Sequence, residues 1–324
     1  MNPAIARTRF LHVAGSAAAS LLAPGAARAQ TAPGAATIRV LIAPSDGVTA
    51  VVYAKHAGLF EKAGLDVTLD TQHNGAAVAA GVASGNYDIG NSSVTSILLA
   101  HERGLPFTLI APAGIYREGG EPSSGAIALK DSPLRFGADA NGGVIGVVSL
   151  NGLGQEAFCA WIDAHGGDWT SVHFIELPYT ESGAALLAHR VIAAESVLPA
   201  LTTFLASPNF RFVPTYGAIA PAYLMSTWFT TRDFSTRNPD VVRRFSRVVA
   251  EAATYANAHH AETAPIMADF TKIPLLDMEH MPRAIGGVTL SPTLIQPMIT
   301  AAAKYGNLKK PFPAQELIDS NAVT

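Results

Sequence analysis

Apolar and polar positions alternate along the chain with two different periods, which predict strands and helices in turn. An apolar run of strand length at 38–43 ends at the turn residues 44–47, and 49–60 has the nearly continuous apolar surface of a buried helix. Five further elements follow: a strand at 65–69, an alanine-rich helix opened by Asn74-Gly75, a strand at 87–90, a helix after Ser92-Ser93 and a strand at 107–112. This order favours βαβ units in a mainly parallel sheet.

A second set of elements follows a stretch at 114–124 that is rich in glycine, proline and charge and is predicted to be a surface loop. Beyond it we expect strands at 126–130, 144–148, 172–177 and 191–194, with helices at 153–165, 182–189 and 197–206. A strand at 223–230 returns to the first set, and Asn238 caps a long amphipathic helix. The prediction is an α/β fold of two lobes, each a mainly parallel sheet flanked by helices, joined by two crossing strands. Lobe 1 is 37–127 plus 223–324, and lobe 2 is 128–222.

The first 29 residues have the pattern of a secretory signal peptide. Arg7 and Arg9 precede an apolar run at 10–22, and Ala27-Arg28-Ala29 offers a small-x-small cleavage site. The run is shorter than the roughly 20 residues that a membrane-spanning helix needs. We therefore expect cleavage near Ala29 and a periplasmic protein, exported by the general secretory or the twin-arginine route.

Composition limits the classes of partner. The mature chain exceeds the roughly 250 residues beyond which one core tends to split in two. The formal net charge is −3 for the whole chain and −6 without the three arginines of the leader. The protein therefore lacks the excess of positive charge that would attract nucleic acid or an anionic membrane. The single cysteine, Cys159, has no partner for an internal disulfide and is expected to be a small buried apolar residue.

Four segments carry a resemblance to a known family: 54–67 (AKHAGLFEKAGLDV), 83–90 (ASGNYDIG), 103–106 (RGLP) and 238–245 (NPDVVRRF). Together they resemble the periplasmic solute-binding proteins of ABC importers for nitrate, sulfonates, taurine and thiamine-pyrimidine precursors. The resemblance implies the type II periplasmic-binding-protein fold, hinge closure on a small polar or anionic molecule, an ABC permease as partner, a monomer and no cofactor. Ile192-Ala193 and Leu198-Pro199 stand where the family often has Asp-Ala and Glu-Pro, so the ligand's identity is not carried over.

Ligands of open α/β sheets bind beyond the carboxyl ends of the strands, near helix N-termini. The turns expected there supply the candidate ligand-binding residues, and each turn also fits an ordinary helix cap. The candidates are Ser45, Asp46, Gly47, Asn74, Gly75, Ser92 and Ser93 in lobe 1, and Ser149, Asn151, Gly152, Tyr179, Thr180, Glu195 and Ser196 in lobe 2. Trp228, like Tyr53 and Tyr179, either stacks on a ring of the ligand or completes a core. Hydroxyls, amides and backbone N–H groups suit a carboxylate, a sulfonate or a polar heterocycle, whereas Asp46 and Glu195 suit an amine or a pyrimidine.

No signature of a catalytic or metal site stands out. The chain lacks a Gly-x-Ser-x-Gly elbow, a phosphate-binding loop and a His-Glu-x-x-His helix. His259, His260 and Glu262 come nearest to a metal cluster, but adjacent helical residues do not share a face. We therefore expect no catalytic residue, metal or cofactor. Two alternatives remain: an exported enzyme of the same fold acting on a small carboxylated or sulfonated compound, and the ligand-sensing subunit of a receptor.

Overall fold

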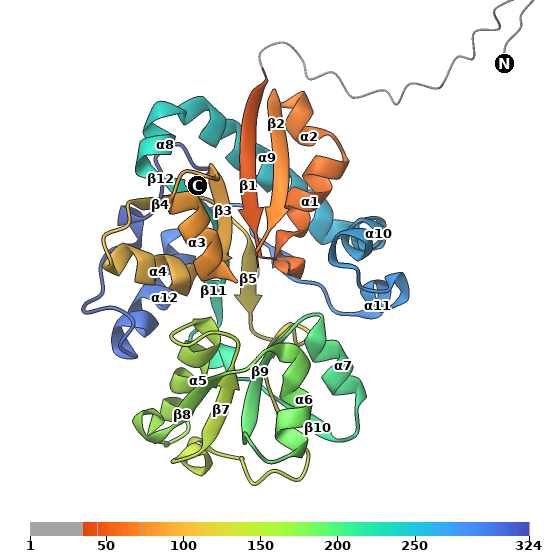
Figure 1. Ribbon diagram of the computed structural model, residues 1–324, viewed down its shortest axis with the longest axis vertical. Helices are drawn as coiled ribbons and strands as arrows, with labels where there is room; N and C mark the ends of the chain where they lie inside the picture. The colour runs from red at the N-terminus through yellow and green to blue at the C-terminus, as the bar shows by residue number, and fades with distance from the viewer. Residues whose placement is uncertain (1–34, 44, 73, 324) are drawn as a thin grey trace, which may run out of the picture. The chain divides into compact units, whose positions relative to one another are not determined.

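The computed structural model describes residues 35–43, 45–72 and 74–323, and the expected signal peptide lies outside them. A first sheet has five strands in the order β2-β1-β3-β12-β4 (Figure 1). Its strands are β1 Ala36–Ile42, β2 Leu65–Thr71, β3 Ile89–Ser93, β4 Phe107–Pro112 and β12 Ser226–Thr231. β1 runs parallel to β2 and β3, and β12 lies antiparallel between β3 and β4.

A second sheet has the order β10-β6-β9-β7-β8. Its strands are β6 Ser124–Leu129, β7 Val144–Val147, β8 His173–Glu176, β9 Ala193–Val197 and β10 Phe210–Val213. β7 runs parallel to β8 and β9, whereas β6 is antiparallel to β9 and β10. The predicted α/β fold with two mainly parallel sheets is confirmed.

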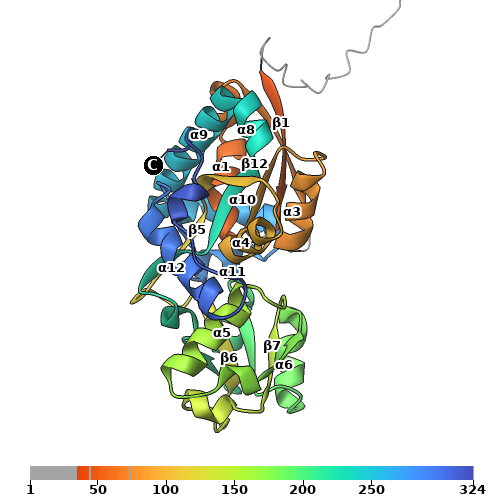
Figure 2. The same cartoon turned by 90° about the vertical axis from the view of Figure 1, so that its left-hand side faces the viewer.

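Helices cover both sheets, and each sheet with its helices is called a lobe below. The first lobe holds α1 Thr49–His56, α2 Leu59–Lys62, α3 Gly75–Ala83, α4 Val94–Glu102, α8 Arg232–Arg237, α9 Pro239–Ala258, α10 His260–Thr271, α11 Leu275–His280 and α12 Pro292–Lys304. The second lobe holds α5 Leu153–Ala164, α6 Tyr179–Leu187 and α7 Ala200–Ala206. Figure 2 shows α3 and α9 on opposite sides of the first sheet.

The two chain crossings between the lobes pair with each other. β5 Gly114–Arg117 and β11 Ala222–Leu224 are antiparallel neighbours, and β13 Ile285–Gly286 extends them to a small third sheet. The prediction of a loop at 114–124 is therefore wrong for residues 114–117, which form β5. Their pairing partner lies about a hundred residues further along the chain, so the local composition carries no signal for this strand.

Three local predictions also need correction. The helix predicted at 49–60 divides in two, because Gly58 has a left-handed φ of +68° between α1 and α2. The strand predicted at 223–230 breaks at Met225, between β11 and β12. Asn238 does not cap α9 with its side chain; its amide donates to the Phe234 carbonyl at 3.0 Å, because α8 ends directly before it.

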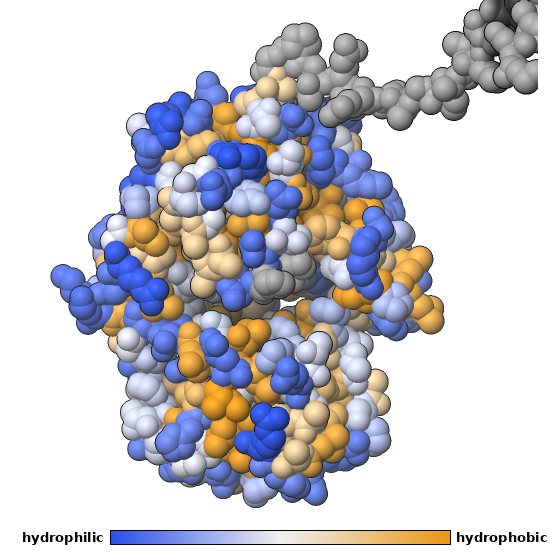
Figure 3. All heavy atoms as spheres, in the orientation of Figure 1, coloured by the Kyte–Doolittle hydropathy of each residue, from blue (hydrophilic) through white to orange (hydrophobic). Residues whose placement is uncertain are grey.

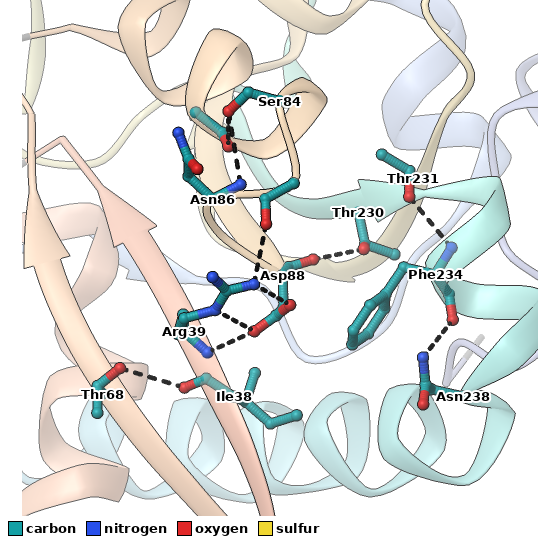
Figure 4. Close-up of polar contacts among 12 residues, drawn as sticks. Ile38, Arg39, Thr68, Ser84, Asn86, Asp88, Thr230, Thr231, Phe234 and Asn238 are labelled. Carbon is teal, nitrogen blue, oxygen red and sulfur yellow. Dashed lines mark hydrogen bonds and ion pairs between the residues drawn. The ribbon is translucent and has the colours of Figure 1, made fainter.

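Hydrogen bonds around Asp88 hold the first sheet in register (Figure 4). The Asp88 carboxylate accepts from both the backbone N–H and the guanidinium of Arg39 on β1, at 2.8 to 3.1 Å. Thr230 of β12 donates to the Asp88 carbonyl at 2.5 Å. About half of the Arg39 side chain is exposed (47%), so this ion pair adds little to stability. Together, the contacts of Arg39 and Thr230 with Asp88 tie β1 and β12 to the start of β3.

No helix in the described part of the chain is both long and apolar enough to span a membrane.

Candidate ligand-binding site

A cleft of about 320 Å³ separates the two lobes, and the space-filling view is hollowed at this level (Figure 3). Residues at the carboxyl ends of the parallel strands of both sheets line it, as expected for open α/β sheets. The structure brings together eleven of the sequence-predicted residues on its walls: Ser45, Asp46, Gly47, Asn74, Gly75, Ser92, Ser93, Ser149, Gly152, Tyr179 and Glu195.

Four predicted residues do not line the cleft. Asn151 lies at the edge between the lobes, where its carbonyl accepts from Asn307 at 3.2 Å, and Thr180 is exposed on α6. Ser196 follows Glu195 in β9 and is fully buried, because successive strand residues point to opposite faces. The sequence predicts a turn at Glu195 and Ser196, but β9 extends to Val197 and contains both residues.

Trp228 belongs to the core of the first lobe. Its side chain is 0% exposed, and its ring packs at 5.8 Å from that of Phe245, so it has no face free for a ligand. Tyr53 stacks on Tyr255 at 4.7 Å between ring centroids and is likewise absent from the cleft walls. Of the three aromatic side chains predicted to stack or pack, Tyr179 alone reaches the cleft.

The first-lobe wall consists of helix N-termini and serine hydroxyls. Asn74 Oδ1 accepts from Ala77 N at 2.9 Å and caps α3, while Ser93 Oγ accepts from Ser96 N at 3.2 Å and caps α4. Both caps agree with the predicted helix starts. Ser92 Oγ is fully buried and has no hydrogen-bond partner among the described residues. It lies against the first turn of α3, since a Cβ built on Gly75 would come within 2.1 Å of it.

Asp46 also lies on this wall, but its charge is already neutralised. Its carboxylate accepts from the Arg283 guanidinium at 2.8 to 3.1 Å and from Ala284 N at 2.6 Å. Both charged side chains are almost fully buried, at 3% and 4% exposure. Asp46 is therefore committed to an internal ion pair, and its carboxylate is not free to receive a ligand amine.

The second-lobe wall is built around Glu195. Its Oε2 accepts from Val148 N at 2.9 Å, and its Oε1 accepts from the hydroxyls of Tyr179 at 3.2 Å and Tyr216 at 2.9 Å. Tyr216 lies in a short 3₁₀ turn, Tyr216–Ala218, and was missed by the sequence analysis. No local pattern marks it, because its partner in the cleft is 21 residues away and in another element.

The Glu195 carboxyl group lies directly over the start of α5. A Cβ on Gly154 would come within 2.1 Å of the carboxyl carbon, so only glycine fits there. Burial raises the pKa of Glu195, although its three hydrogen bonds oppose that shift. Burial and the neighbouring Glu195 charge raise the pKa values of Tyr179 and Tyr216 well above the ordinary range, so both phenols keep their protons.

One edge of the cleft is bridged by α5, which contacts helices of the first lobe. Thr95 on α4 donates to Glu156 Oε2 at 2.7 Å, and Lys304 on α12 pairs with Asp163 at 2.5 Å. Glu156 is 1% exposed, and no described residue donates to its Oε1. Burial raises the pKa of Glu156 to about 8. The lobes are thus joined along this edge as well as through the paired strands.

The described residues provide neither a reactive thiol nor a metal-binding cluster. Cys159 is buried, and burial raises its pKa to about 12, so the thiol is protonated at neutral pH. Within 35–43, 45–72 and 74–323, no group of three or more His, Cys, Asp or Glu side chains is arranged to hold a metal ion.

Comparisons with known proteins agree on the fold. A sequence profile of the family described as NMT1/THI5 like matches residues 46–263, and no curated protein matches the sequence. The periplasmic aliphatic sulphonate-binding protein of Escherichia coli is 15% identical with a TM-score of 0.71, over 87% of this chain and 97% of that one. The periplasmic nitrate-binding protein of Synechocystis PCC 6803 is 14% identical with a TM-score of 0.69, over 88% and 86%. The zinc-bound ligand-binding component of an ABC-type import system from Staphylococcus aureus is 12% identical with a TM-score of 0.73, over 88% and 96%.

Proposed function

Because the chain belongs to the NMT1/THI5-like family, we propose that it is an extracytoplasmic, non-catalytic binding protein that captures a small polar or anionic organic molecule and delivers it to an ABC importer. The observation that carries the proposal is the cleft of about 320 Å³, with hydrogen-bonding groups on both walls. Its volume lies at the small end of the range for ligand pockets. The sulphonate- and nitrate-binding proteins of similar fold support this class of ligand.

The proposed mechanism is closure of the lobes around the bridged edge. α5 stays in contact with α4 and α12 there, while the opposite side of the cleft carries no comparable set of polar bridges among the described residues. A ligand that contacts both walls gains its full set of interactions only when they approach. Binding therefore shifts the equilibrium between open and closed forms by that difference in free energy.

The proposed division of the chain is 37–127 plus 223–324 for lobe 1 and 128–222 for lobe 2. The strand assignments support it to within a few residues, since β6 of the second sheet begins at Ser124 and β12 of the first sheet at Ser226. We propose further that the mature protein is a periplasmic monomer starting near Gln30. N-terminal sequencing of protein from the periplasmic fraction tests the cleavage site; a retained leader would contradict it.

A thermal-shift screen of the mature protein tests the binding function. The compounds are sulfonates, nitrate, aromatic carboxylates, pyrimidines and amino acids, and a ligand that binds the folded state raises the melting temperature. Ser149→Trp, which fills the cleft, should abolish the shift, whereas Ser320→Trp, at an exposed position outside it, should preserve the shift. The proposal fails if no compound binds and native mass spectrometry finds no small molecule carried by the purified protein.

Closure and catalysis are checked with the same ligand. Small-angle X-ray scattering should show a smaller radius of gyration on binding, and an unchanged radius would contradict closure. Mass spectrometry of the recovered ligand should show the unaltered compound. Conversion of the compound would replace the proposed role with that of an exported enzyme.

A further inference from the structure

We propose that the two walls of the cleft recognise opposite ends of the ligand. The first lobe binds a group that accepts hydrogen bonds, and Tyr179 and Tyr216 of the second lobe bind a group that donates them. This inference rests on the proposed binding function and deepens it by naming a ligand class. The class is a small carboxylic or sulfonic acid that carries an amino or hydroxyl group remote from the acid.

On the second-lobe wall, the hydroxyl protons of Tyr179 and Tyr216 are already used within the protein. Three donors, Val148 N and the two phenols, surround the Glu195 carboxyl group, and this arrangement stabilises an ionised carboxylate. Both phenols therefore donate to its Oε1. Each phenol has a single proton, and that proton is used in the contact with Glu195. Only the lone pairs of the Tyr179 and Tyr216 oxygens remain for the cleft. A ligand group placed against them must therefore be a donor.

The first-lobe wall, by contrast, has hydrogen-bond donors that are not used within the protein. Ser92 lines the cleft, and its buried Oγ has no partner among the described residues, so its hydroxyl proton is available to a ligand acceptor. It lies at the first turn of α3, where free N–H groups and the helix dipole favour negative charge. Ser93 and Ser96 at the start of α4 hydrogen-bond to each other at 2.9 Å, so one hydroxyl proton of this pair remains for the ligand. This wall suits a carboxylate or sulfonate.

The charges of the two walls orient the ligand. Among the described residues no cation contacts the Glu195 carboxylate, whereas the Asp46 charge on the opposite wall is cancelled by Arg283. An acidic group is therefore repelled from the second lobe and accepted by the first. Leu153, Leu198 and Met225 supply apolar surface in the cleft, which suits a short carbon skeleton between the two ends.

Matched series of small acids test the inference by calorimetry. The probes are propanoate, 3-hydroxypropanoate and 3-aminopropanoate; ethanesulfonate with its 2-hydroxy and 2-amino analogues; and benzoate with its 4-hydroxy and 4-amino analogues. In a series that binds, the hydroxyl or amino member should bind about tenfold more tightly than the parent acid, as one added hydrogen bond implies. Equal binding of the parent acid would overturn the inference.

Variants on each wall test the two ends of the ligand separately. Tyr179→Phe should reduce the tenfold preference to about threefold or less, because one acceptor is lost while Tyr216 still holds Glu195. Ser92→Ala should weaken every member of the series by a similar factor and leave the preference unchanged. A preference that survives both Tyr179→Phe and Tyr216→Phe would overturn the assignment, provided the melting temperatures stay near that of the wild type.

The ligand carried by the purified protein separates this inference from the binding function. If native mass spectrometry identifies a bound compound without any hydrogen-bond donor, the inference fails while the binding function stands. If neither the probes nor any other small molecule binds, both fail. A bound acid with a remote amino or hydroxyl group supports both.

Discussion

The two walls of the cleft share a strand–turn–helix design, yet each handles its buried carboxylate differently. On the first-lobe wall, Asp46 pairs with the cation Arg283 and the pair is electrically neutral. On the second-lobe wall, Glu195 is held by a backbone N–H and two phenols, which are all neutral donors, and no described cation contacts it. The fold therefore supplies helix N-termini to both walls, while the residues around Asp46 and Glu195 determine whether a cation neutralises each carboxylate.

The largest expected effect comes from breaking the neutral pair on the first wall. Arg283→Ala leaves Asp46 buried and uncompensated, so the free energy of unfolding should fall by roughly 3–5 kcal/mol. Urea denaturation measures this loss. The double variant Asp46→Asn/Arg283→Met removes both charges and should recover most of it. A loss below about 1 kcal/mol in Arg283→Ala would mean that the pair is not structurally important.

The free energy of unfolding should depend on pH through Glu156, which lies on α5 at the bridged edge of the cleft. Its pKa is raised from 4.5 to about 8 in the folded protein, so the fold favours the protonated form. Stability from this group is fully present below about pH 4.5 and is lost as the pH rises towards 8. The slope approaches about 1.4 kcal/mol per pH unit inside that window.

Glu156→Gln should remove most of this slope in urea denaturation between pH 5 and 8. Glu195 also has a raised pKa and contributes a fall of the same sign in both proteins, so the test is the difference between wild type and variant. Identical slopes for the two proteins would contradict the assignment.

On the second wall, a single methyl group should displace Glu195. Gly154→Ala places a Cβ within 2.1 Å of the carboxyl carbon, and the overpacking should cost about 1–3 kcal/mol, although alanine normally stabilises a helix. Gly120→Ala is the matched control, because its Cβ would meet only one atom, at 3.9 Å. Thermal unfolding of both variants is the measurement. Equal melting temperatures would show that Glu195 moves without cost.

The smallest expected effect on stability comes from removing the N-cap of α3 on the first-lobe wall. Asn74→Ala removes the cap of α3 and should lower the free energy of unfolding by about 1 kcal/mol. Asn74→Asp keeps the cap and should preserve stability, but its negative charge faces the cleft and should weaken binding of the acidic probes. Unchanged affinity for those probes in Asn74→Asp would argue against an acid-binding first wall.

Local chemistry explains which elements could be predicted. The caps at Asn74 and Ser93 bond to backbone groups three residues away, so a short stretch of sequence contains both partners. The strand at 107–112 coincides with β4 because its six residues are all buried and read as one apolar run. By contrast, β5 was taken for a loop because its stability comes from pairing with β11.

The candidate site divides in the same way. Turn residues such as Ser45 and Ser149 were predicted to face the cleft because their position follows from the strand ends, and both line it. Tyr216 was missed because nothing near it in the chain indicates its contact with Glu195. The sequence left Trp228 open between stacking on a ligand and completing a core, and packing against Phe245 of α9 places it in the first-lobe core.

The sequence alone determined the order of strands and helices, the helix starts and the turns that carry hydroxyl groups, because these depend on interactions within a few residues. Only the tertiary structure decided which carboxylate is paired with a cation and which is held by neutral donors. Arg283 reaches Asp46 across 237 positions of the chain, and Tyr179 and Tyr216 reach Glu195 from two different elements. Long-range partners of this kind are selected by packing, and no local pattern specifies them.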